Sequence, residues 1–122
     1  MTIAYWCVVL VMFLPLIWVG IAKANGSGYD NNRPREWLAH QKGRAARANW
    51  AQQNSYEAFP PFAAAVIISH LVGNPQLYID MLAVFFVACR IAHGLFYIND
   101  KSTARSLVFL GGYGATVALF LI

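Results

Sequence analysis

Twenty consecutive residues near the start of the chain, Ile3 to Ala22, carry no charged side chain. A helix of about twenty apolar residues matches the hydrocarbon core of a bilayer, which is roughly 30 Å thick. The stretch has no Lys or Arg before it and is longer than the apolar part of a secretory signal peptide. It therefore predicts a membrane-spanning helix, and the rest of the chain has to fold in a way that is compatible with one.

The composition agrees with a membrane location. Of the 122 residues, 59% are hydrophobic and 11% are charged, whereas soluble domains average about 25% charged residues. An ordinary globular fold would leave too much apolar surface in water. The length suits one domain, and we expect residues 1–122 to form it. Cys7 and Cys89 lie in apolar stretches and match no metal spacing, so we assign them to packing and expect no metal site.

Four apolar stretches divide the chain. The expected spans cover about residues 3–22, 45–73, 77–98 and 102–122. Short segments rich in Gly, Asn, Asp and Pro separate them and are typical of turns and loops. The sequence therefore predicts an all-α integral membrane protein with four transmembrane helices.

The second stretch is less uniform than the others. Its apolar part, Phe59 to Val72, is short for a span, and a polar, helix-forming lead-in from about Arg35 to Ala58 precedes it. Pro60 and Pro61 lie inside the apolar part. A proline within a helix removes a backbone donor and crowds the preceding turn, which a membrane helix tolerates where neighbours satisfy the freed carbonyls. We therefore expect a kink beside Glu57.

Lysine and arginine are concentrated in two of the connections. The first loop and the lead-in carry Lys23, Arg33, Arg35, Lys42, Arg44 and Arg47, and the third loop region carries Lys101 and Arg105. The second loop and both termini carry none. Because cytoplasmic loops are enriched in Lys and Arg, we expect both basic connections to face the cytoplasm and to attract anionic membrane lipid. These residues adjoin membrane spans, so we expect no nucleic-acid partner.

A first polar cluster immediately precedes the apolar part of the second span. Asn54 and Glu57 are three residues apart, so they share one face of a helix. A carboxylate this close to hydrocarbon needs a partner. The ammonium group of a ligand would serve, and so would an Arg from another helix, with a clamp to Arg90 as the purely structural alternative.

A second cluster lies inside the third span. Arg90, His93 and Tyr97 recur at i, i+3 and i+7, which places them in a narrow stripe of one helix. A charge in hydrocarbon costs roughly 2.5–3.5 kcal/mol on insertion scales and is usually kept where it pairs or lines a wet cavity. A lone buried His is most often structural, but the three together predict the wall of a polar cleft.

Arg105 and Ser106 open the fourth span. The N-terminus of a helix adds partial positive charge and free amide donors. An Arg in that field is suited to holding an anion, including a reactive thiolate. The alternative is an Arg that only marks the membrane interface.

In this order, the clusters resemble the MAPEG family, the membrane-associated proteins in eicosanoid and glutathione metabolism. The family includes microsomal glutathione transferases, a prostaglandin synthase branch and a non-catalytic lipoxygenase-activating protein. Its second-span signature reads here Asn54-Ser55-Tyr56-Glu57-Ala58-Phe59-Pro60-Pro61-Phe62, and its third-span signature is Phe85 to His93 followed by Tyr97. Arg105-Ser106 matches the start of the fourth span in the prostaglandin synthase branch. The likeness runs from Ala45 to the C-terminus.

The resemblance implies a four-helix bundle that assembles as a homotrimer, with glutathione bound as co-substrate in clefts between subunits. It implies that Asn54 and Glu57 hold the polar ends of glutathione, with Glu57 facing the ammonium group. The residues that would line the same site are Arg90, His93 and Tyr97.

The resemblance also implies the catalytic group. Arg105, with Ser106, would stabilise the glutathione thiolate, and a lipophilic electrophile or hydroperoxide would arrive from the bilayer. Family enzymes usually carry an Arg four residues before the Asn, whereas this chain has Trp50 there. Arg47, about one turn earlier, is the candidate substitute in glutathione binding.

Three functions fit these features. The first is a glutathione-dependent transferase or peroxidase of bacterial type, in a bacterial inner membrane, since the sequence shows no retention signal. The second is a non-catalytic member of the same fold that binds lipid or a partner, which Trp50 favours. The third, a small multidrug transporter, has a similar length, but such carriers need a charged residue in a first span that is uncharged here.

Overall fold

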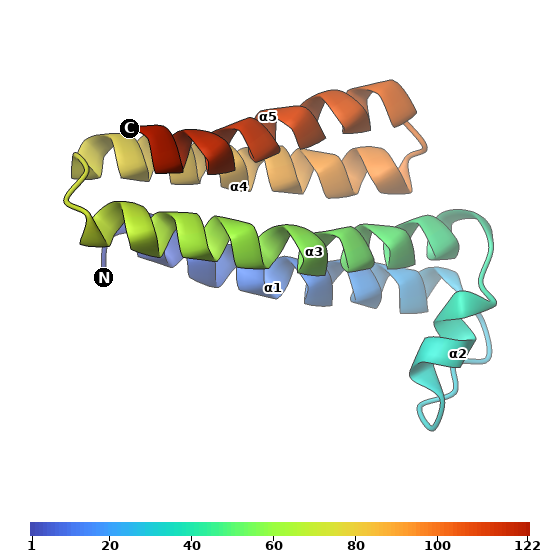
Figure 1. The fold of residues 1–122 in the computed structure, drawn as a ribbon. Coiled ribbons are helices and arrows are strands. Elements are labelled where there is room, and N and C mark those ends of the chain that lie inside the picture. Colours follow the sequence, from blue (N-terminus) through green and yellow to red (C-terminus); the bar gives the residue numbers. More distant parts are fainter.

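Five helices make up the chain, which the computed structural model describes from Met1 to Ile122. They are α1 (Ile3–Asn25), α2 (Pro34–Ala39), α3 (Gly43–Leu71), α4 (Gln76–Ile98) and α5 (Ser102–Leu121). The four long helices lie side by side with alternating direction, and the short α2 projects from one end (Figure 1). Both termini lie at the opposite end. The four long helices closely follow the four predicted stretches.

Three of the helices are long and apolar enough to cross a membrane. They are α1, α4 and α5, with mean hydropathies of 2.3, 1.9 and 1.4. Only 30 of the 122 residues are buried within the chain, and many large apolar side chains point outward. A soluble monomer rarely exposes so much contiguous apolar surface. These faces therefore need lipid or another protein surface to cover them.

The first half of α3 is polar, so composition alone identifies three spans rather than the four that the sequence predicts. The helix has 29 residues, which is long enough to cross a bilayer. It continues through Pro60 and Pro61 without interruption (Figure 1). The expected kink therefore does not divide α3 into two helices.

The expectation of one continuous helix from about Arg35 is wrong. The helix α2 ends at Ala39, and α3 begins only at Gly43. Gly43 has φ +60°, a left-handed backbone conformation that residues with a Cβ rarely adopt. Pro34 lies at the first turn of α2, where its fixed φ favours a helix start. These two residues make α2 a separate element beside the basic end of the bundle.

Two apolar clusters form the interior. The cluster nearer the termini includes Phe62 of α3 and Phe86 of α4, whose rings stack with centroids 3.9 Å apart. The cluster nearer α2 includes Ala51 of α3 and Ile98 of α4. The stretches of α3 and α4 between these residues therefore form a polar layer between the two clusters, and they carry the candidate site.

Candidate functional site

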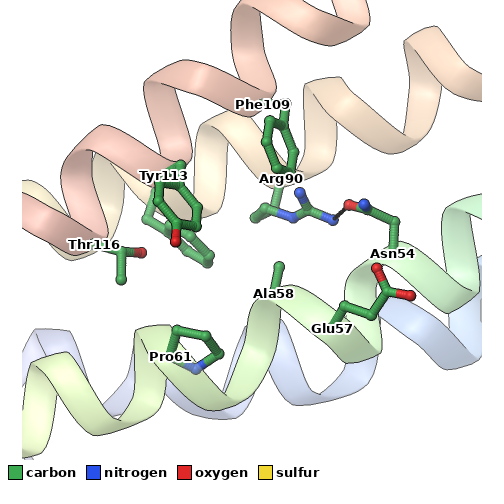
Figure 2. A pocket seen from close by; sticks show the side chains of 9 residues that line it. Asn54, Glu57, Ala58, Pro61, Arg90, Phe109, Tyr113 and Thr116 are labelled. Atoms are coloured by element: carbon green, nitrogen blue, oxygen red, sulfur yellow. Dashed lines mark hydrogen bonds between the residues drawn. The ribbon is translucent and has the colours of Figure 1, made fainter.

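A cavity of about 170 Å³ opens in this polar layer between α3, α4 and α5 (Figure 2). All three helices contribute side chains to it. Its lining consists of Asn54, Glu57, Ala58 and Pro61 from α3, Phe86 and Arg90 from α4, and Phe109, Tyr113 and Thr116 from α5. The structure thus brings three of the predicted site residues, Asn54, Glu57 and Arg90, to a single cavity.

Arg90 is the charged group at the centre of this site. Its side chain reaches from α4 toward α3, where Nη2 donates a hydrogen bond of 2.6 Å to Oδ1 of Asn54 (Figure 2). The residue is 2% exposed, and its Nε has no hydrogen-bond partner. A buried donor without a partner carries a desolvation penalty of about 1–3 kcal/mol. An acceptor from a ligand in the cavity would remove that penalty.

Glu57 lies one turn along α3 from Asn54 and is exposed on the open side of the cavity (Figure 2). Its carboxylate forms no ion pair, because the one salt bridge of the structure joins Arg33 to Glu36. The hydrogen bond that clamps α3 to Arg90 is therefore made by Asn54 and not by Glu57. The Glu57 carboxylate remains free to bind a cation.

His93 adjoins the cavity without lining it. Its side chain is 3% exposed, and Nδ1 has no hydrogen-bond partner. The imidazole packs against the ring of Phe109, a cavity residue, with centroids 6.0 Å apart, and edge-on against Tyr97 at 5.6 Å. His93 thus connects the cavity to the aromatic side chains nearer the basic end.

Tyr97 joins three helices at that end. The guanidinium carbon of Arg105 on α5 lies 4.4 Å from the centroid of the Tyr97 ring, a cation–π contact. The ring of Trp50 on α3 packs from another direction, 6.3 Å away between centroids. Arg105 does not line the cavity of Asn54, Glu57 and Arg90. The predicted site therefore forms two adjoining groups of residues.

The remaining two candidates lie outside the cavity. Arg47 Nε donates a hydrogen bond of 3.0 Å to the carbonyl oxygen of Ile98, the last residue of α4. A cation is favourable at a helix C-terminus, so Arg47 fastens the start of α3 to the end of α4. Ser106 is exposed, and its hydroxyl makes no hydrogen bond within the chain. A ligand on the α5 surface could reach its hydroxyl.

Sequence reasoning missed the contribution of α5. Phe109, Tyr113 and Thr116 line the cavity at i, i+4 and i+7, a spacing that places them on one helix face and could have identified them. Gly112, next to Tyr113, packs closely on α4, since a Cβ added there would lie 3.4 Å from Cys89 Cβ. That close approach brings the neighbouring face of α5 to the cavity.

Comparison with models of known protein families gives a match. The family model described as MAPEG family covers residues 3–122. The match extends over all five helices, including α1 and α2, which precede the likeness from Ala45 to the C-terminus found in the sequence motifs. No curated protein matches the chain. The extent of the family match and the three apolar helices show that this chain is an integral membrane protein and belongs to the MAPEG family.

Proposed function

We propose that the protein is a membrane glutathione-dependent transferase or peroxidase that acts on lipophilic electrophiles. Membership of the MAPEG family supports a glutathione-related function. The observation that carries the proposal is the cavity itself, where the free carboxylate of Glu57 and the buried guanidinium of Arg90 lie on facing helices. A zwitterionic ligand with carboxylates and an ammonium group complements that pair of charges.

Each polar end of glutathione has a partner in this arrangement. The exposed Glu57 carboxylate would bind the ammonium group of the γ-glutamyl residue. Arg90 Nε, which lacks a partner, would donate to a glutathione carboxylate. Asn54 uses its Oδ1 to accept from Arg90, and its Nδ2 donates no hydrogen bond within the chain. That nitrogen is a second donor for the ligand.

The size of the cavity supports a glutathione site that is formed by two neighbouring subunits. A volume of about 170 Å³ lies below the roughly 300–1,000 Å³ of common small-molecule sites. One subunit would therefore hold only part of a tripeptide. Glu57 and Tyr56 are both exposed on α3, and polar groups within a bilayer usually face other protein or water. A homotrimer that places glutathione between subunits would supply the missing wall.

The chemistry would begin at Arg105. Its guanidinium is held over Tyr97 at the start of α5, where it would stabilise the glutathione thiolate, with the Ser106 hydroxyl as a further donor. In transfer, the thiolate forms a C–S bond and the leaving group departs with its electron pair. In peroxide reduction, the thiolate attacks the terminal oxygen of the hydroperoxide, the O–O bond breaks, and the rest of the peroxide leaves as the alcohol after taking up a proton. A second glutathione then reduces the resulting sulfenic acid to give glutathione disulfide and water.

The membrane arrangement belongs to the same proposal. All Lys and Arg residues except Arg90 lie in the connections and helix ends at the α2 end of the bundle. The bias of cytoplasmic loops toward Lys and Arg supports placing that end in the cytoplasm, with α3 as the fourth span. The membrane would be a bacterial inner membrane, and the electrophile would enter from its hydrocarbon.

A second candidate function is the binding of lipid or a partner without catalysis. Trp50 favours it, because an indole stands where family enzymes usually carry an Arg. The ring is 48% exposed and packs on Tyr97, so it adds apolar surface beside Arg105 and no charge. This candidate predicts that ligands stabilise the protein without being converted.

Turnover in detergent distinguishes the two candidates. The wild-type protein would be supplied with glutathione and either an aryl halide or an organic hydroperoxide. Arg105→Ala should lower kcat by roughly 10²–10³, because it removes a donor to the developing charge. Lys101→Ala is the matched control, since Lys101 is an exposed cation one turn earlier whose side chain makes no hydrogen bond or ion pair. A wild-type protein without thiol-dependent turnover would refute the enzyme proposal.

A further inference from the structure

A second cavity, of about 460 Å³, lies at the basic end of the molecule between α1, α2 and α3. It shares no lining residue with the candidate site. Its α3 residues are Asn49, Gln52, Gln53 and Tyr56, which lie on a different face of the helix from Asn54 and Glu57. Its volume is within the roughly 300–1,000 Å³ range of small-molecule sites.

The polar lining of this cavity consists of hydrogen-bond donors and cations. It includes Lys23 from α1 and Arg35 from α2, together with Asn49, Gln52, Gln53 and Tyr56. No Asp or Glu lines it. Two cations without a carboxylate between them attract an anion, and the amide and phenol groups can donate to its oxygens.

Several of these donors are unused. Arg35 takes part in no ion pair or side-chain hydrogen bond. The Lys23 ammonium lies 4.6 Å from the centroid of the Tyr29 ring, a contact that leaves its N–H groups free. Asn49 is 5% exposed; its Oδ1 accepts a 3.0 Å hydrogen bond from Gln52, and its Nδ2 donates none within the chain. The Asn49 Nδ2 group is therefore free to donate to a ligand in the cavity.

We propose that this second cavity binds a phosphate group, supplied either by an anionic lipid headgroup or by a soluble phosphate. Lys23 is in the last turn of α1, the uncharged span, so the cavity lies near the level of the headgroups. Val19 and Leu38 provide apolar lining beside the polar groups. That combination suits a phosphodiester attached to glycerol. The proposal does not depend on glutathione binding or catalysis.

Thermal unfolding of the purified protein in neutral detergent tests this site. The additions would be phosphatidylglycerol, phosphatidylcholine or inorganic phosphate. The double variant Lys23→Gln/Arg35→Gln should weaken the apparent affinity for phosphatidylglycerol by roughly tenfold or more, since each cation near an anionic lipid contributes about 1 kcal/mol. Lys42→Gln/Lys101→Gln loses the same charge from two exposed residues outside the cavity and should keep the wild-type affinity.

The outcomes separate the sources of the anion. Stabilisation by phosphatidylglycerol alone supports a lipid site, and stabilisation by inorganic phosphate as well supports recognition of the phosphate group itself. Equal losses in the two double variants would show only general surface attraction and overturn the proposal. Absence of stabilisation by either anion would overturn it too. Loss of glutathione binding in Lys23→Gln/Arg35→Gln would assign the cavity to the glutathione site instead.

Discussion

Arg90 and Asn54 join α4 to α3 through a hydrogen bond of 2.6 Å in the layer between the two apolar clusters. The bond satisfies one nitrogen of a guanidinium that is 2% exposed and leaves Nε without a partner. The same side chain therefore holds two helices together and presents a free donor to the cavity. Its structural role and its proposed binding role can be separated by mutation.

Asn54→Ala should destabilise the protein. Without the amide oxygen, the buried Arg90 guanidinium loses its only hydrogen-bond partner, and the cost should be about 1–3 kcal/mol. Asn54→Asp keeps an acceptor and should retain more of the stability. Thermal or denaturant unfolding in the same detergent measures both. An Asn54→Ala protein as stable as the wild type would show that water or detergent satisfies Arg90.

Gly94→Ala should destabilise the contact between α4 and α1. A Cβ at this position would collide with the indole ring of Trp18 on α1, and overpacking of a core typically costs about 1–3 kcal/mol. Gly114→Ala is the matched control, because a Cβ there meets no atom within 4 Å. It should be neutral or stabilising by up to about 1 kcal/mol, as expected for Ala in place of Gly in a helix. Similar unfolding midpoints for both variants would contradict this packing.

Tyr97→Leu should lower turnover through Arg105. The substitution removes the ring beneath the guanidinium, and a partly exposed cation–π contact contributes about 0.5–1 kcal/mol, or roughly a two- to fivefold effect on kcat. Tyr97→Phe keeps the ring face and should stay near the wild-type rate. Steady-state kinetics with saturating glutathione measures the difference. Equal losses in both variants would instead assign the role to the Tyr97 hydroxyl.

Asp80→Ala should loosen the end of the bundle that holds the termini. Oδ1 of Asp80 accepts hydrogen bonds from the Ala4 backbone N–H at 2.9 Å and from Gln76 Nε2 at 2.8 Å. It therefore satisfies a free amide in the first turn of α1, and loss of such a cap costs about 0.5–2 kcal/mol. Asp80→Asn keeps an acceptor oxygen. If hydrogen exchange at the Ala4 amide is unchanged in Asp80→Ala, the cap is unimportant.

The long helices could be predicted because apolar runs end at strong turn formers. Gly73, for example, has φ +80° directly after α3. The break before α3 was missed because the residues from Arg35 onward favour a helix locally. The left-handed backbone at Gly43 and the start at Pro34 override that preference, and a single Gly in a polar segment does not identify such a break by itself.

The cavity residues on α3 and α4 could be predicted because ionisable groups are rare in apolar segments. The sequence could not predict which of these residues pair, because Asn54 and Glu57 share one helix face. Only the packing of α3 on α4 brings Arg90 to Asn54 rather than to Glu57. The contact of Arg47 with Ile98 was equally hidden. It depends on how closely the start of α3 approaches the end of α4, a distance that neither segment encodes alone.

Glutathione binding, measured by calorimetry on the purified protein in detergent, tests the central claim most directly. The wild-type protein should bind glutathione saturably, and Glu57→Gln should weaken binding at least tenfold, because it removes the partner of the ligand ammonium group. Glu36→Gln, which loses the same charge on exposed α2, should bind like the wild type. Absence of binding at millimolar glutathione, or equal weakening in both variants, would contradict the proposed site.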